Sequence, residues 1–282
     1  MNSLKTVALL GLMSGILLFG GELVGGRNGL MIGLLLAVGM NFFSYFFSDK
    51  LALASCSAQP LTQEDNPEIY ARMYPLIQGL AQRMNLPMPK LWVIPDPSPN
   101  AFATGRDPDH ASVAFTEGIL GLMNDQELEA VIAHELGHVL HRDILISSVA
   151  ATLAAAISFV GRMAFWFGGR RDDEDERGGA VGGLVMMIVA PIAAMLIQMA
   201  ISRSREYSAD EASAKYMGSP EPLIHALGQL ERGVERVPMY DPSPATAHLY
   251  IMNPFRAGFL ASLFSTHPPT EQRIARLQAM RH

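Results

Sequence analysis

Apolar stretches without any charged residue alternate with polar stretches along the chain, and four of them are long. They are Thr6–Gly21, Asn28–Ser48, Ile144–Gly161 and Gly178–Ser202. A helix needs about 20 apolar residues to cross the hydrocarbon core of a bilayer. The first stretch reaches that length through Leu23 and Val24 if Glu22 sits at the interface, and the third resumes beyond Arg162. The pattern therefore predicts four transmembrane helices.

Two alternatives to spanning helices stay open at this point. The first stretch follows Lys5 and has the length of the apolar region of a signal peptide, although no small-residue cleavage site precedes the second stretch. The third and fourth stretches are rich in alanine and glycine, so they are also compatible with a pair of buried core helices.

The composition supports the membrane class. Hydrophobic residues make up 49% of the chain and charged residues 17%, whereas about 25% is usual for soluble proteins. The net charge of −6 provides no basic field of the kind that nucleic-acid binding requires. Cys56 is the only cysteine, which excludes an intrachain disulfide and a metal site built from cysteines.

We divide the chain according to this pattern. Residues 1–48 hold the first two predicted spans, and residues 144–202 hold a transmembrane hairpin with the charged loop "RRDDEDERGG". Residues 49–143 and 203–282 are polar, and we expect them to form two parts of one domain that the hairpin interrupts.

Short helix and strand patterns fill the first polar part. Ile69, Met73, Ile77 and Leu80 recur at helical spacing before Pro87, which predicts a helix. The segments "KLWVIP" and "HASVAFTEGIL" are typical of short strands, and they flank the turn-rich segment "DPSPNAFATGRDPD".

The segment "MNDQELEAVIAHELGHVLHRD" predicts a helix that carries metal ligands. Asn124 is suited to cap this helix, with Glu127 completing a capping box. His134 and His138 are four residues apart, so their imidazoles lie on one helical face and can bind one tetrahedral zinc. Glu135 projects beside such a metal, where it can take a proton from water.

A catalytic zinc takes a third protein ligand and keeps one position for water. The segment "SRSREYSADEASA" offers Glu206 and Asp210 on one helical face. We expect Glu206 to bind the metal and Asp210 to accept a hydrogen bond from the other ring nitrogen of a ligating histidine. The alternative third ligand is His141, but the glycine turn that brings a later histidine to the metal is missing here.

The ligands lie close to the apolar stretches. The third stretch begins six residues after His138, about 9 Å along a helix, and Glu206 follows the fourth stretch by four residues, about 6 Å. We therefore expect the zinc helix to extend into the third span. The returning span then brings Glu206 back to the same side of the membrane.

Four segments carry a family resemblance: "HELGHVLHRD", "SRSREYSADEASA", "NAFATG" and "STHPPTEQRI". Together they resemble the HtpX-type membrane zinc endopeptidases, which are relatives of the Ste24 CAAX proteases. The resemblance covers essentially the whole chain. It implies a mainly α, membrane-integral fold, in which a helical transmembrane bundle joins a zincin-like (gluzincin) catalytic domain with a small β-sheet. It also implies one Zn²⁺ per chain on His134, His138 and Glu206, with Glu135 catalytic.

The resemblance further implies a biological setting. It places the chain in the cytoplasmic (inner) membrane as a multi-pass protein with a cytoplasmic active site, clearing misfolded or damaged proteins under stress. Its expected partners are protein substrates, the lipid bilayer and other membrane proteases, and not nucleic acid. A role in CAAX processing is not expected, because that branch carries more spans. Positive charges near the spans number five on each side, so the orientation rests on the resemblance and on Cys56.

Two further residues are candidates for supporting roles. His267 in "STHPP" is a candidate donor to the oxyanion, the alternative being a turn residue before Pro268. Asn100 is a candidate for hydrogen bonding to the substrate backbone, and "HASVAFT" for the strand edge onto which an extended peptide adds. The alternatives are an ordinary turn and a core strand.

Two rival functions would require different features in the sequence. A non-catalytic membrane scaffold or chaperone that keeps a structural metal would be expected to close the site with four protein ligands, often cysteines. A metal transporter would require ionisable residues inside the spans. Three ligands with a glutamate beside them favour an enzyme instead.

Overall fold

The computed structural model describes residues 2–153, 203–239, 246–254 and 268–280 of the chain. The fourth predicted span, the end of the third and the candidate His267 lie outside the described residues.

The first two predicted spans form a helical hairpin. Helix α1 runs from Asn2 to Ser55 and bends at Gly26, which has the left-handed φ of 54°. The two halves approach so closely that a Cβ atom on Gly29 would lie 2.0 Å from the carbonyl oxygen of Gly21. Only glycine allows this contact between helix backbones. The segment Gly26–Ser55 is long and apolar enough to cross a membrane, and the shorter apolar segment Leu4–Phe19 precedes it.

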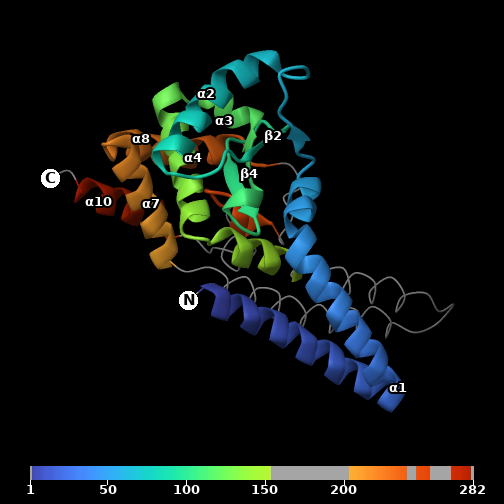
Figure 1. Ribbon diagram of the computed structural model, residues 1–282. Coiled ribbons are helices and arrows are strands. Elements are labelled where there is room, and N and C mark those ends of the chain that lie inside the picture. The colour runs from blue at the N-terminus through green and yellow to red at the C-terminus, as the bar shows by residue number, and fades with distance from the viewer. Residues whose placement is uncertain (1, 154–202, 240–245, 255–267, 281–282) are drawn as a thin grey trace, which may run out of the picture.

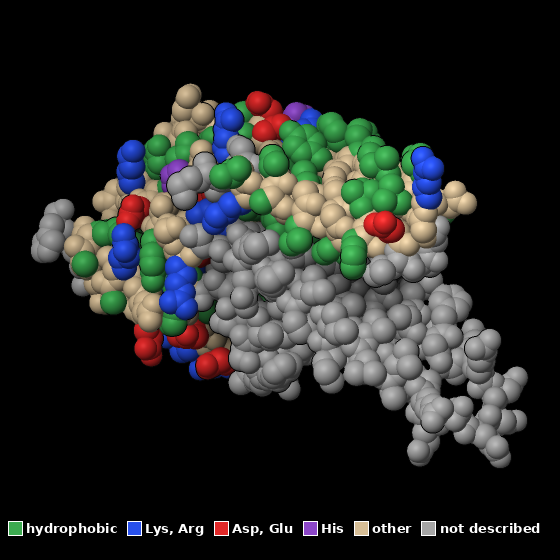
Figure 2. Space-filling model, turned by 90° about the horizontal axis from the view of Figure 1, so that it is seen from below, with side chains coloured by type: hydrophobic (Ala, Val, Ile, Leu, Met, Phe, Trp, Pro, Cys, Tyr) green, Lys and Arg blue, Asp and Glu red, His purple; other side chains and the backbone are tan. Residues whose placement is uncertain are grey.

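The bend of the α1 hairpin lies far from the sheet, whereas both ends of α1 pack against the rest of the molecule (Figure 1). In the most apolar part of Gly26–Ser55, only 17% of the residues are buried. Seen from below, hydrophobic side chains gather over this part of the molecule, whereas most charged side chains lie toward the other end (Figure 2). Such an apolar surface on a helix of this length fits a lipid environment.

A small mixed sheet forms the centre of the polar domain. Its strands β1 (Gln59–Pro60), β2 (Lys90–Ile94), β3 (Ala101–Gly105) and β4 (Ala111–Thr116) follow the order β1-β2-β4-β3. The β2–β4 pair is parallel, and the two outer pairs are antiparallel. The prediction of strands is confirmed for "KLWVIP" and for the first part of "HASVAFTEGIL", whereas "EGIL" lies in the helix Glu117–Leu122.

Two expectations about this sheet are wrong. The segment "NAFATG" is not only a turn, because β3 forms there between its flanking turns, and all five of its residues are buried. Burial of these small and aromatic side chains outweighs the turn residues on either side. Strand β4 pairs on both sides, so it offers no edge to a peptide. The edge strands are β1 and β3.

Helices pack around the sheet. They are α2 (Pro67–Arg83), α3 (Glu117–Leu122), α4 (Asp125–Leu140), α7 (Arg203–Met217), α8 (Glu221–Arg236) and α10 (Thr270–Gln278), with the short 3₁₀ segments η1 (Pro108–His110) and η2 (Ala247–Leu249). Fully buried Met73, Ile77, Phe115 and Leu136 belong to the main core that these elements share. The predicted helix before Pro87 corresponds to α2 and is confirmed.

Helix α4 begins as predicted but ends earlier. Asn124 accepts a hydrogen bond from Glu127 N at 3.0 Å, and the Glu127 carboxylate accepts one from Asn124 N at 3.1 Å, which confirms the capping box. The helix does not run on into the third span. Arg142 adopts a left-handed φ of 57°, and the amides of Arg142 and Asp143 bond back to the carbonyls of Val139 and His138.

These two bonds form a Schellman turn, which ends a helix. A new helix follows over Ile144–Leu153 and takes a different direction from α4 (Figure 1). The sequence carries no glycine at the turn, which is why the break escaped prediction.

Candidate active site

Close packing of α4 against α7 brings the predicted ligands together. Gly137 lies where the helices meet, and a Cβ atom there would lie 3.0 Å from the Cα of Ala209. The Ser213 hydroxyl of α7 also donates to the carbonyl of Ala130 in α4, at 2.7 Å. The "HELGH" glycine therefore has a structural role, since it lets the α7 backbone approach between the two histidines.

The three predicted metal ligands form one group. His134, His138 and Glu206 each offer a donor atom, and these atoms lie within 4.8 Å of one another. The Nε2 atoms of His134 and His138 lie 3.7 and 3.6 Å from the two carboxylate oxygens of Glu206. Two ligands of a tetrahedral zinc, each bonded at about 2.1 Å, lie about 3.4 Å apart. The spacing and chemistry of this donor set therefore fit a zinc ion.

The other ring nitrogen of His134 faces a buried ion pair. His134 Nδ1 lies 2.9 Å from Asp210 Oδ1, in the position expected for Asp210. Arg273 of α10 bonds both oxygens of Asp210, at 2.6 and 3.0 Å, and its Nη2 lies 3.3 Å from His134 Nδ1. The three side chains are each 1% exposed.

Arg273 was not singled out from the sequence, although one signal was present. Thr270, Arg273 and Leu277 recur at helical spacing in α10 and are all buried. A charged residue on the apolar stripe of a short helix indicates a buried partner.

Glu135 lies at the edge of the sheet. Its Oε2 accepts a hydrogen bond from the amide of Ala103 in β3, at 2.9 Å, and its side chain is 2% exposed. Burial raises the pKa of Glu135 to about 8, and the charge of Glu206 acts in the same direction. A carboxyl with a pKa near neutrality can both accept and return a proton.

The two histidines differ in their electrostatic surroundings. Burial, together with the positive charge of Arg273, lowers the pKa of His134 to about 4. Burial also disfavours the charged form of His138, but the nearby Glu206 carboxylate and a hydrogen bond with Asp143 raise its pKa to about 9. The carboxylates of Glu206 and Asp143 thus account for the raised pKa of His138.

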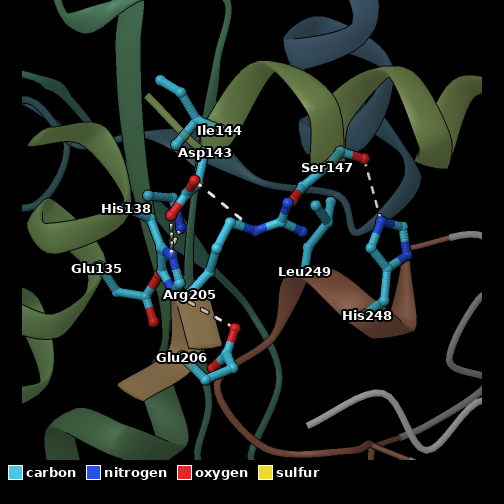
Figure 3. A pocket seen from close by; sticks show the side chains of 10 residues that line it. Glu135, His138, Asp143, Ile144, Ser147, Arg205, Glu206, His248 and Leu249 are labelled. Atoms are coloured by element: carbon cyan, nitrogen blue, oxygen red, sulfur yellow. Dashed lines mark hydrogen bonds and ion pairs between the residues drawn. The ribbon is translucent and has the colours of Figure 1, made fainter. Parts of the chain in front are cut away.

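A cavity opens beside the ligands (Figure 3). Its lining includes Glu135, His138 and Glu206, together with Ser147 and His248. His248 is buried, and its Nε2 lies 3.0 Å from the carbonyl oxygen of Ser147. Glu135 and His138 come from α4 and Glu206 comes from α7, and these two helices are distant in sequence.

The candidate Asn100 makes hydrogen bonds within the protein. Its Nδ2 donates to Met252 O at 2.9 Å, and its Oδ1 accepts from the amides of Met252 and Ala101, both at 3.2 Å. The residue is fully buried. Its amide thus holds the segment after η2 against β3, and those hydrogen bonds compete with any bond to substrate.

His141 lies apart from the metal ligands. It is the C-cap of α4 and is exposed to solvent, and it does not belong to the three-residue donor group. Glu206 therefore remains the third ligand that the geometry favours.

Comparisons with known proteins find related sequences over nearly the whole chain. The model of peptidase family M48 matches residues 69–281. A protease HtpX homolog from Desulfatibacillum aliphaticivorans is 51% identical, over 99% of this chain and 90% of its own length. One from Thermodesulfovibrio yellowstonii is 50% identical over 99% of both chains.

A solved structure shows the same fold. The crystal structure of Ste24p from S. mikatae matches with a TM-score of 0.51 at 18% identity, over 98% of this chain. The chain spans 64% of the length of that protein. At this identity the match is evidence of the fold alone.

Proposed function

The chain belongs to peptidase family M48, and from this premise we propose that it is a membrane-bound zinc endopeptidase. The observation that carries the proposal is the buried group of His134, His138 and Glu206, with the carboxyl of Glu135 beside it. His134, His138 and Glu206 hold the metal, and Glu135 is the general base. The site cleaves peptide bonds in protein substrates.

The chemistry divides between the metal and the chain. A zinc ion on these ligands supplies Lewis acidity, lowers the pKa of water from about 15.7 towards about 7 and favours the ionised form of Glu135. Glu135 accepts a proton from the attacking water and returns it to the leaving amine. The amide of Ala103 holds the Glu135 carboxylate in place for both transfers. His267 remains the proposed donor to the oxyanion.

The substrate strand is expected to lie along β3. An extended peptide that adds to a sheet edge gains main-chain hydrogen bonds. The β3 edge passes Glu135 at Ala103, whereas Ala101 O already accepts a hydrogen bond from Ile251 N. The substrate strand is therefore placed beside Ala103, next to the general base. The amides of Ala103 and Gly105 already donate to Glu135 and to the Ser148 hydroxyl, so they do not pair with it.

The setting is a membrane. The apolar hairpin α1 supports membrane insertion, and its aromatic residues Phe42, Phe43, Tyr45 and Phe46 are exposed just before Lys50, as at a membrane interface. We propose a multi-pass protein of the inner membrane, with the active site on the cytoplasmic side. Misfolded or damaged membrane proteins are its proposed substrates, and other membrane proteases its proposed partners.

The test replaces the general base without disturbing the ligands. Purified Glu135→Gln protein in detergent is expected to bind one zinc per chain and to cleave unfolded casein at least about 10²-fold more slowly than the wild type. Glu129→Gln is the matched control, since Glu129 lies on α4 but pairs with Arg83 outside the site. It is expected to keep wild-type activity. Undiminished cleavage by Glu135→Gln would exclude the general-base role.

A further inference from the structure

The turn after α4 folds the chain back over the second zinc histidine. Asp143 N donates to the carbonyl oxygen of His138 at 2.8 Å, and Arg142 takes the left-handed conformation that this return requires. Left-handed backbone is unfavourable for a residue with a side chain, so the surrounding contacts must hold this turn in place. One such contact is made by the Asp143 side chain.

The Asp143 carboxylate lies between a histidine and an arginine. Its Oδ2 is 3.4 Å from His138 Nδ1, and its Oδ1 is 3.7 Å from Arg205 Nε. The Asp143 side chain is 3% exposed and that of Arg205 is 12% exposed (Figure 3). A buried carboxylate in this position requires positively charged or hydrogen-bonding neighbours.

The arrangement parallels the one behind the other histidine. His134 has Asp210 at its Nδ1, at 2.9 Å, and Arg273 behind that carboxylate, at 2.6 Å. His138 has Asp143 and Arg205 in the same order, at the longer distances of 3.4 and 3.7 Å. The helix α4 supplies both histidines, but the carboxylates come from α7 in one case and from the turn after α4 in the other. Arg205 also directly precedes the ligand Glu206.

We propose that Asp143, held by Arg205, is a positioning residue that sets the orientation of the His138 imidazole for metal binding. By accepting the hydrogen of Nδ1, Asp143 fixes the tautomer in which the lone pair of Nε2 points toward Glu206. Arg205 forms an ion pair with Asp143 and directly precedes Glu206 in the sequence. It therefore connects the residue behind His138 with the third ligand. The inference rests on the proposed zinc site.

Zinc affinity measures this role without any cleavage assay. Metal-free protein in detergent is titrated with zinc against a chromophoric chelator, and Co²⁺ is bound in parallel so that its visible absorption reports ligand geometry. Asp143→Asn is expected to bind zinc about 10–100-fold more weakly and to shift the Co²⁺ spectrum. Asp143→Glu restores the charge and is expected to recover part of the affinity.

The control is an aspartate that pairs with a histidine elsewhere. Asp107 lies 2.6 Å from His110 Nδ1 on the surface, so Asp107→Asn is expected to leave zinc affinity and spectrum unchanged. Wild-type affinity in Asp143→Asn would overturn the inference, and so would a loss that Asp143→Glu does not relieve at all.

Two further results keep the test decisive. If Asp143→Asn does not fold by circular dichroism, Arg205→Gln takes its place. It is expected to lower the zinc affinity several-fold with a shifted Co²⁺ spectrum, and wild-type values would overturn the inference. If the wild-type protein itself binds no zinc, the proposed function fails first, which is distinguishable from failure of the positioning role alone.

Discussion

Arg273 is among the largest side chains that the described part of the chain buries completely. Transfer of a guanidinium from water into a protein interior is costly, and the two hydrogen bonds to Asp210 offset that cost. Burial opposes the ionised form of Asp210, yet Arg273 and His134 together hold the pKa of Asp210 below its usual value. These charges therefore stabilise one another only as a set.

Loss of Arg273 should consequently destabilise the protein strongly. Arg273→Met leaves Asp210 charged and buried, and we expect unfolding in detergent to require about 3–5 kcal/mol less free energy. Arg276→Met is the matched control, because Arg276 lies one turn further along α10 and pairs with Glu211 of α7 at the surface. Its expected cost is under about 1 kcal/mol. Denaturant titrations compare the two, and equal losses would contradict the argument.

The active site at the scale of elements is the contact between α4 and α7. Each helix carries part of the ligand set, so the distance between their axes determines whether Glu206 reaches the histidines. Gly137 makes this distance short, since the place of its missing side chain is occupied by Ala209. Zinc binding and helix packing are therefore coupled at one residue.

Gly137→Ala tests this coupling. Alanine favours a helix over glycine by about 1 kcal/mol, but here its Cβ would force α7 outward. We expect a net destabilisation of about 1–3 kcal/mol and weaker zinc binding. In Gly79→Ala, a Cβ on α2 meets no atom closer than 3.8 Å, so the same substitution is expected to stabilise the protein by about 0.5–1 kcal/mol. Thermal unfolding and chelator competition measure both effects, and stabilisation by Gly137→Ala would contradict the coupling.

The whole molecule combines a buried polar site with an apolar hairpin that leaves most of its surface uncovered. The first half of α1 packs against the helix Ile144–Leu153, since Leu9 and Met13 share a core with Ile146 and Val149. Ile144–Leu153 in turn begins directly after Asp143, so the hairpin and the site are connected through one short helix.

Insertion of α1 should depend on the depth of a charge. Val38 lies within the apolar segment Gly26–Ser55 and is 62% exposed, whereas Leu51 lies near its end and is 38% exposed. Val38→Arg is expected to cost about 2.5–3.5 kcal/mol of insertion free energy and to lower the fraction of chain that stays in membranes after an alkaline wash. Leu51→Arg can reach the interface and should have little effect. Equal retention of both variants would argue against a span centred near Val38.

Local patterns in the sequence were sufficient for several features. The spacing of His134 and His138 places them on one face of any α-helix, and the Asn124–Glu127 capping box marks where that helix begins. The apolar run Gly26–Ser55 of α1 has the length of a membrane span regardless of what surrounds it. Glu206 and Asp210 were also identified, since their chemistry suits a ligand and its neighbour. Each of these inferences uses residues a few positions apart.

The tertiary structure alone decided the rest. Arg273 bonds to Asp210, which lies 63 positions earlier in the sequence. Strand β3 lies at an edge of the sheet because β4 is its one partner strand in the described sheet. Helix α4 ends at Leu140 because Arg142 adopts a left-handed conformation, and no glycine in the sequence indicates this turn. The same turn places Asp143 beside His138 Nδ1. The physical reason is common to these cases. Local pattern reports the conformation of neighbouring residues, whereas the surroundings of a buried charge are set by segments that only folding brings together.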